Sequence, residues 1–441
     1  MEENDEINID ASSASLEDVE DTDNSTVKVV RHIMEKYKKA ETNREQDEIR
    51  WLKAYKNYRG LYDSDVQFTE AEKSRVFIKT TKTKTLAAYG QLADVLFAGN
   101  KFPLTIEPTE LPEGVIESVS LDPQKPDEVK RDPNESPYGF DGDGRDIPVG
   151  ATERTLLENL GPLSEKLKDV DGLEQGAGQT PSAITFHPAM IAAKKMEKKI
   201  HDQLQESNAN THLRSTAFEM ALFGTGIMKG PFALDKEYPN WDNEGNYDPL
   251  FKTVPLVSHV SVWNFFPDPD ANNMEEAQYI FERHKMSRSQ LRGLKRRPYF
   301  RCNGFDVCIT MGENYVKQSW EDDLADYTNS EEINRFEVFE YWGKMDKNLA
   351  EEAGLDINPD EVDILDEVDI NAWVCNGHIL RLVLNPFTPS RLPYMVCPYE
   401  INPYQFFGVG IPENMDDSQT IMNGHARMAI DNLALAGNPV S

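Results

Sequence analysis

The chain lacks the long apolar run that a membrane-spanning protein needs. No stretch of about 18 or more apolar residues occurs among its 441 residues, and its start, MEENDEINID, lacks the basic and apolar character of a signal peptide. Cysteine is scarce, and Cys302, Cys308, Cys375 and Cys397 stand at spacings that match no zinc pattern. We therefore expect free buried thiols, no membrane partner, and synthesis in a reducing cytoplasm.

Positive charge is also in short supply. The chain has 77 acidic and 46 basic residues, which gives a net charge of −31. A protein that grips nucleic acid neutralises phosphates with Lys and Arg, so this balance argues against DNA binding as the main activity. DNA that only passes by would be held weakly, although solubility alone also explains the charge.

Basic side chains gather in two places. For both, a solvated helix start or a contact with an acidic neighbouring subunit is a better explanation than nucleic-acid binding. The two basic clusters are Lys73, Arg75, Lys79, Lys82 and Lys84, and the run Lys194–Lys199.

The sequence contains no recognisable catalytic set. Its eight histidines form no HxxxH or HExxH pair, and no serine stands in a GxSxG turn. Gly224–Gly230 follows a helical pattern and its spacing matches no nucleotide-binding loop, so it indicates the end of a helix. We predict that the protein is not an enzyme and needs no cofactor.

Two acidic segments match cation sites only in part. Asp268 and Asp270 begin like a calcium loop, but Asn273 stands where that loop needs Gly and Tyr279 where it needs Glu. A turn that caps a helix at Glu275–Phe281 fits better, so we predict no metal. A cation-dependent hydrolase that uses the two aspartates is the enzyme alternative. A second weak candidate for a cation site is formed by Asp141, Asp143 and Asp146. These residues stand in a predicted loop, and the default interpretation is a hydrated segment that binds no cation.

The chain begins with a segment that we expect to be disordered. Met1–Ser25 carries ten acidic residues, no basic one and few large apolar side chains, so it buries too little surface to order itself. Amphipathic helical spacing follows from Val27 to Gly60. Glu110–Thr185 is rich in Pro, Gly and Asp and is predicted to be an insertion or a long loop.

Periodicity and turn residues predict further elements. Ser287 is a plausible N-cap, and Asn376-Gly377 is the strongest hairpin signal in the chain. The predicted helices are Thr85–Leu96, Pro188–Leu204, His212–Phe223 and Ser287–Arg297, and the predicted strands are Val254–Phe266, Phe336–Trp342 and two around Asn376-Gly377.

The last part of the chain holds the most informative pattern. Gly408 and Gly410 permit a tight turn, Pro412 suits a first helical turn, and a helical pattern then runs from Ile411 to Ala436. Apolar residues recur every seven positions in two rows about 100° apart, so the helix could contact a neighbour along each row. We interpret it as an assembly helix, with one broad core-facing side as the alternative. The rows are Met415, Met422, Ala429 and Ala436, and Ile421, Met428 and Leu435.

This segment resembles the portal proteins of tailed bacteriophages, particularly the short-tailed ones. The pattern within Arg391–Ser441 is PY..NPYQFFGVGIPE...D.Q...N...R...DN...AGNP. Val76–Phe97, which comes before an expected strand at Leu104–Pro108, resembles an early helix of that family. Val254–Leu294 resembles its F..DP.A.....A.Y...R...S...L stretch.

The resemblance implies an α+β fold: an elongated subunit with a helical wing, a helical stem and a small α/β clip, assembled as a ring. Family members usually continue through further helices past the point where this chain stops. The implied segments are an acidic tail (1–25), a wing (26–285) with an insertion (110–185), a first stem segment and approach to the clip (286–332), the clip (333–398), and a stem helix leading to the tunnel loop (399–441).

The resemblance also implies a function. Twelve subunits would form a channel at one capsid vertex of the virion, through which DNA is packaged and ejected. Implied partners are the large terminase, a tail adaptor, scaffold and major capsid protein, and double-stranded DNA that passes through weakly bound. Another structural virion or adaptor protein is the main alternative. Expected tunnel-proximal residues are Arg427, Gly437, Asn438 and Pro439, and expected interface residues are Met415, Ile421, Met422, Met428, Ala429 and Leu435.

Overall fold

The structure of the chain is a computed structural model. It describes residues 16–437 except 64–65, 71, 98–101, 103, 110–118, 123–124, 130–137, 141–145, 149–183, 187, 242–246, 326–333, 359–362 and 364, with the backbone alone for 16–25 and for the strands of 119–186. The chain divides into two compact units, residues 1–98 with 204–441, and residues 99–203. No helix in the described ranges is long and apolar enough to cross a membrane.

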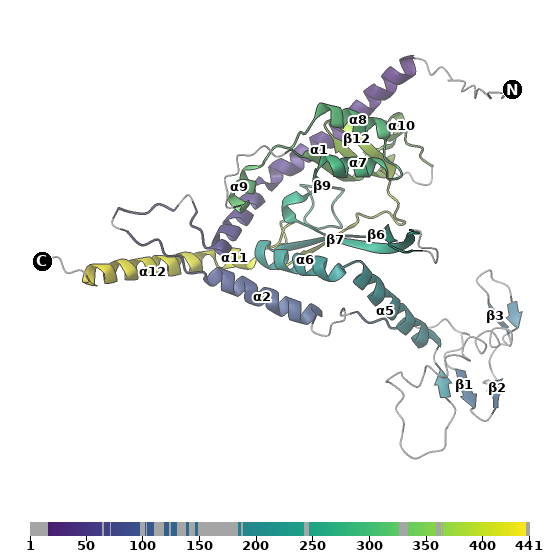
Figure 1. Cartoon of the computed structure of the whole chain (residues 1–441), viewed down its shortest axis with the longest axis horizontal. Helices are drawn as coiled ribbons and strands as arrows, with labels where there is room; N and C mark the ends of the chain where they lie inside the picture. Colours follow the sequence, from purple (N-terminus) through teal and green to yellow (C-terminus); the bar gives the residue numbers. More distant parts are fainter. Residues whose placement is uncertain are drawn as a thin grey trace. The chain divides into compact units, whose positions relative to one another are not determined.

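Helix α1 (Leu16–Arg59) runs the length of the first unit's two cores (Figure 1). Gly60 ends the helix with a φ of +81°, as the sequence predicts. The predicted disorder of Met1–Ser25 is wrong for Leu16–Ser25, which are helical, because acidic side chains are favoured at the positive end of a helix dipole. The expectation for residues 1–15 lies outside the described part. The buried side chains of α1 include Val29, Val30, Ile33, Tyr37, Ala40 and Trp51.

A five-stranded antiparallel sheet forms the first core, in the order β12-β11-β10-β9-β8. Asn376 and Gly377, with φ of +49° and +76°, make the turn between β11 and β12 and confirm the predicted hairpin. The predicted helix at Glu275–Phe281 is wrong, because Ile280 and Phe281 lie in a strand and are buried in the sheet. The strands are β8 (Phe265–Pro267), β9 (Tyr279–Met286), β10 (Phe336–Asp346), β11 (Glu367–Cys375) and β12 (His378–Leu384).

Helices cover both faces of this sheet. On one face, α1 packs with α10 (Lys347–Glu352) against β10 side chains such as Phe339. On the other, α7 (Arg288–Lys295) and α8 (Cys302–Met311) pack against Phe336 and neighbouring side chains. Odd and even positions of β10 thus enter different cores, as the two-residue period of a strand requires.

Two sequence predictions near the α7–α8 face of the sheet, a helix cap and free thiols, are confirmed. Ser287 caps α7 in a reciprocal capping box with Gln290. Cys308 and Cys375 are free and buried, and Cys397 is free and half-buried. The five-stranded sheet and the helices on this face come from three expected segments: β8 and β9 up to residue 285 belong to 26–285, α7 and α8 to 286–332, and β10–β12 to 333–398.

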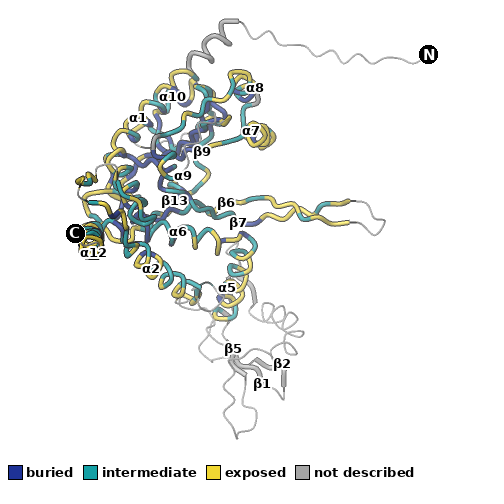
Figure 2. Tube along the Cα trace, turned by 60° about the vertical axis from the view of Figure 1, so that its left-hand side comes forward, coloured by how far each residue is buried: buried dark blue, intermediate teal, exposed yellow. Residues whose placement is uncertain are grey.

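A second, three-stranded sheet has the order β13-β6-β7. It packs with α6 (Ala209–Phe223), the C-terminal half of α1 and α9 (Ser319–Ala325) around Trp51, Trp263 and Trp320. The outer part of β6 and β7 continues as a two-stranded ribbon that projects from the sheet (Figure 2). The remaining elements here are β6 (Thr225–Tyr238), β7 (Leu250–Val260), the short helix η2 (Val262–Asn264), β13 (Tyr394–Pro398) and α2 (Thr80–Phe97).

The second unit contains short strands within the predicted insertion. β1 (Val119–Asp122) pairs with β2 (Lys125–Val129) and β5 (Ile184–Phe186), and β3 (Tyr138–Phe140) pairs with β4 (Asp146–Pro148). Helix α5 (Pro188–Glu206) begins in this unit, as predicted. The expected strand at Leu104–Pro108 is wrong, because these described residues form no strand.

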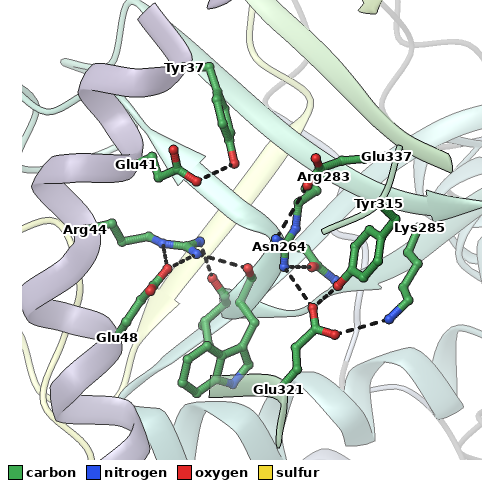
Figure 3. Close-up of polar contacts among 12 residues, drawn as sticks. Tyr37, Glu41, Arg44, Glu48, Asn264, Arg283, Lys285, Tyr315, Glu321 and Glu337 are labelled. Carbon is green, nitrogen blue, oxygen red and sulfur yellow. Dashed lines mark hydrogen bonds and ion pairs between the residues drawn. The ribbon is translucent and has the colours of Figure 1, made fainter. Parts of the chain in front are cut away.

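A buried arginine attaches α1 to the turn between β7 and β8 (Figure 3). Arg44 donates to the carbonyl oxygens of Val262 at 3.1 Å, Trp263 at 3.1 Å and Phe265 at 2.7 Å, and Val262 O also accepts from the amide of Phe265. Its guanidinium also lies 3.6 Å from the ring centre of Phe266. Sequence periodicity gave no sign of this role.

Replacing Arg44 by Met is expected to lower the free energy of unfolding by about 2 kcal/mol, because the buried carbonyls of Trp263 and Phe265 lose the guanidinium donor and that of Val262 keeps only the Phe265 amide. Urea denaturation followed by tryptophan fluorescence measures the change. Arg31→Met, at an exposed position of the same helix, serves as the matched control. Equal stability of the two variants would contradict this role.

A second buried network lies between the two sheets. Lys229 Nζ donates to Glu282 Oε2 at 2.7 Å and to Glu340 Oε2 at 2.5 Å, and His284 Nε2 lies 2.8 Å from the same Glu340 oxygen. Tyr394 Oη donates to Glu282 at 2.8 Å. Burial alone would raise the pKa of Glu340, but Lys229 and His284 hold it well below its usual range.

Candidate assembly helix

Three glycines bring the C-terminal turn against the end of α6. Gly224 ends α6 in the left-handed region, with a φ of +85°, and donates to Met220 O, so the predicted helix end is confirmed. A Cβ on Gly408 would lie 2.6 Å from Gly224 O, and one on Gly410 would lie 2.7 Å from Leu222 O. Only glycine permits this close backbone contact, which fixes where the following helix begins.

The predicted helix Ile411–Ala436 is present in two parts. A short turn, α11 (Ile411–Asn414), ends at Met415, and α12 (Asp416–Gly437) follows. Acidic side chains at this start bind α1: Asp416 lies 2.6 Å from Lys53 Nζ, and Glu413 lies 3.4 Å from Arg50. The start of α12 is therefore held to the body of the unit.

A row of polar residues, spaced four apart on α12, contacts a preceding segment of the chain. We call residues 72–81 the strap. Gln419 Oε1 accepts from the amide of Thr81 at 3.0 Å and from its hydroxyl at 2.8 Å, and Asn423 Oδ1 accepts from the amide of Ile78 at 2.9 Å. Asp431 accepts from Ser74 N at 2.9 Å. Gln419 and Asn423 are only 1 % and 3 % exposed.

The third member of this polar row is Arg427. Its guanidinium lies 5.1 Å from the ring centre of Tyr62 and 5.3 Å from that of Phe68, on the segment between α1 and the strap. The positive charge of Arg427 therefore forms cation–π contacts within its own chain. Its expected position near the tunnel stays a prediction.

Replacing Gln419 by Leu is expected to release the strap locally, because the amide and hydroxyl of Thr81 then lose their acceptor and the carbonyl of Ile78 loses its donor in a buried site. The cost is about 1–3 kcal/mol. Faster hydrogen exchange at residues 78–81, with β10 unchanged, is the expected result. Thr420→Leu, at an exposed position one residue later, is the control, and similar protection in both variants would contradict the role of Gln419.

The apolar side of α12 faces away from the rest of the chain. Ile421 is 60 % exposed, Leu433 71 % and Leu435 73 %, and Ala429 is also exposed. The predicted alternative, a broad core-facing apolar side, is therefore wrong. The side of α12 that packs on its own chain is polar, which reverses the usual pattern of an amphipathic helix.

The residues expected at an interface lie mostly on this apolar side. Met422, Met428, Ala429, Ile421 and Leu435 are exposed, whereas Met415 is half-buried at the junction of α11 and α12. Sequence analysis missed a further exposed member, Leu433. Gly437 ends α12, and the expected tunnel residues Asn438 and Pro439 lie outside the described residues.

The acidic groups considered as cation sites have other partners. Asp268 accepts from the amides of Asp270 and Gln278, so it fixes the predicted turn, although no helix follows at Glu275–Phe281. Glu282, His284 and Glu340 could approach one ion, but the Lys229 ammonium already lies between the two carboxylates. The candidates Asp141, Asp143 and Asp146 have no described side chains.

Comparison with known protein families gives one match in the C-terminal part of the chain. Residues 251–440 match the family described as Phage SU10 portal protein. The matched range includes two of the three segments that resemble portal proteins, Val254–Leu294 and most of Arg391–Ser441. It also contains the whole of α12. No curated protein matches the chain.

Proposed function

Because the chain carries a phage portal-protein domain of the SU10-like, short-tailed type, we propose that it is a portal-vertex subunit whose α12 helices assemble a ring. The match confirms the resemblance found in the sequence, and the family is structural. The ring would form the channel through which viral DNA is packaged and ejected. The virion is the location that membership of the portal family implies.

The observation that supports assembly most is the exposed apolar side of α12. Isolated apolar side chains on a surface are ordinary, but a contiguous row along a helix marks a contact site. A closed ring needs heterologous contacts, in which different faces of each subunit meet. The polar row holds α12 in place within one subunit, and the apolar side is left for a neighbour.

We further propose that the helical wing, stem and clip follow the family arrangement, with α12 in the stem. A ring of twelve, docking of large terminase and tail adaptor, and contacts with scaffold and major capsid protein belong to the same proposal. Assembly in the host cytoplasm agrees with the free thiols Cys308 and Cys375.

Mass photometry of the purified full chain tests the proposal. A species of about twelve subunits is expected, and negative-stain images should show a ring with a central hole. A monomer at all concentrations would contradict it. An open or differently sized assembly would favour the alternative of another virion or adaptor protein. Loss of a measured hydrolytic activity in Asp268→Ala and Asp270→Ala would instead favour the enzyme alternative.

Weak binding of duplex DNA is the expected property of such a channel. Each subunit carries a net charge of −31, so few phosphates can be neutralised and the salt dependence of binding should be shallow. Fluorescence anisotropy at several salt concentrations measures both quantities. Nanomolar affinity that disappears in the triple variant Lys79→Glu/Lys82→Glu/Lys84→Glu would contradict it.

A further inference from the structure

One strongly basic surface of the first unit lies around the Asp431 carboxylate, which accepts from the backbone amides of Lys73 and Ser74. The cluster lies on the strap and the first turns of α2, and Lys82 lies 5.7 Å from the ring centre of Tyr58. No ion pair joins its side chains to a described carboxylate. The cluster, which we call the basic cluster, is Lys73, Arg75, Lys79, Lys82 and Lys84, of which all but Lys82 are exposed.

The basic cluster adjoins the apolar side of α12. The hydroxyl of Thr80 lies 3.7 Å from the sulfur of Met422, and the strap itself binds Gln419 and Asn423. A subunit that contacts the apolar side of α12 therefore lies next to the basic cluster. Charged rims of this kind select the partner and its orientation.

We propose that the basic cluster binds the acidic N-terminal segment, Met1–Ser25, of a neighbouring copy of the chain. This inference rests on the proposed ring and names a second contact within it. Met1–Ser25 contains ten acidic residues and no basic one, which complements a cluster of five basic residues. Each subunit supplies one donor surface and one acceptor surface, as a heterologous ring contact requires.

The length of α1 excludes binding within one chain. The helix has 44 residues, so at 1.5 Å per residue Leu16 lies about 65 Å from the end at Arg59. The segment that leads to the strap begins at that end, where Tyr62 Oη donates to Val76 O. Residues 1–15 span at most about 50 Å in any conformation, so they cannot reach the basic cluster of their own subunit.

Two acidic residues of the other acidic run of the chain have local partners. Glu351–Asp369 holds nine acidic residues, but Glu352 lies 3.2 Å from Lys28 Nζ and Asp363 lies 2.7 Å from Lys344 Nζ. Duplex DNA is the other polyanion, and the net charge of the chain repels it. The N-terminal segment is therefore the occupant that charge and reach favour.

Carbodiimide cross-linking of the full chain tests the proposal, because the reagent joins carboxylates directly to lysine amines. Rings are co-assembled from equal amounts of ¹⁵N-labelled and unlabelled chain, and cross-linked peptides are identified by mass spectrometry. Peptides that join residues 1–25 to Lys73, Lys79, Lys82 or Lys84 should combine labelled with unlabelled material. Links confined to one label, links to Glu351–Asp369 instead, or links abolished by added duplex DNA would overturn the proposal.

Charge reversal gives a second test. Lys79→Glu/Lys82→Glu/Lys84→Glu should raise the protein concentration for half-assembly by roughly tenfold at low salt and less at high salt, because screening weakens such contacts. Adding Glu17→Lys/Glu20→Lys/Asp21→Lys should restore assembly, and Lys194→Glu/Lys195→Glu/Lys198→Glu is the matched control. Absence of rescue would overturn the proposal. If the unaltered chain forms no ring, the proposed function itself fails.

Discussion

Replacing Lys229 by Met is expected to lower the free energy of unfolding by about 3–5 kcal/mol. The ammonium group lies within 2.7 Å of carboxylate oxygens of both Glu282 and Glu340, and the side chains of the lysine and the two glutamates are 11 %, 11 % and 3 % exposed. Without it, two carboxylates stay buried between the sheets with only neutral donors and His284. Thermal and urea unfolding of the variant measure the loss.

The matched control removes the charges together. Lys229→Met/Glu282→Gln/Glu340→Gln leaves no buried carboxylate without a counter-charge, so it should recover most of the lost stability. The Glu282→Gln/Glu340→Gln variant completes a mutant cycle, which separates the energy of the charge interaction from the effect of the altered packing. A single Lys229→Met variant as stable as the parent would show that this network does not hold the two sheets together.

Local sequence signals predicted many of the elements of the fold. The helix end at Gly60, the cap at Ser287, the hairpin at Asn376-Gly377 and the end of α6 at Gly224 each depend on one or two residues whose backbone preference is strong. The prediction failed where a short apolar run was ambiguous. Ile280 and Phe281 fit a helix turn or a strand equally well until β10 pairs beside them.

The pairing of strands that are far apart in the chain could not be predicted from the sequence. β9 pairs with β10 across some fifty residues, and β13 pairs with β6 across more than a hundred and fifty. The buried roles of Arg44 and Lys229 depend on those pairings, since each charge finds its partners only in the folded chain. When a charged residue stands in a charged stretch, the sequence does not indicate that its side chain is buried.

The candidate assembly helix was predicted in part. Its apolar rows were visible in the sequence, as was its start at Gly408 and Gly410. The polar row from Gln419 to Asp431 was not predicted, because its role depends on the strap, which lies more than three hundred residues earlier. Which side of α12 packs on the rest of its own chain could therefore be assigned only from the structure.

Replacing Ala429 by Glu is expected to abolish ring assembly while the single subunit stays folded. Ala429 is exposed in the chain, so a glutamate there is hydrated and costs the subunit little. In a packed contact along α12, the same carboxylate would be buried without a partner, at a cost of several kcal/mol per contact. Every contact in a closed ring would carry this cost. The free energy of association between subunits should then no longer favour the ring.

Mass photometry and circular dichroism on the same sample separate the two effects. The Ala429→Glu protein should run as a monomer with the helical spectrum and melting temperature of the parent subunit. Leu433→Glu should act alike, because Leu433 is 71 % exposed on the same side of α12, whereas Ala192→Glu, at an exposed position of α5, should assemble normally. If Ala429→Glu and Leu433→Glu still form full rings, the subunits meet through another surface. The exposed apolar side of α12 would then need a different partner, because the chain itself does not cover it.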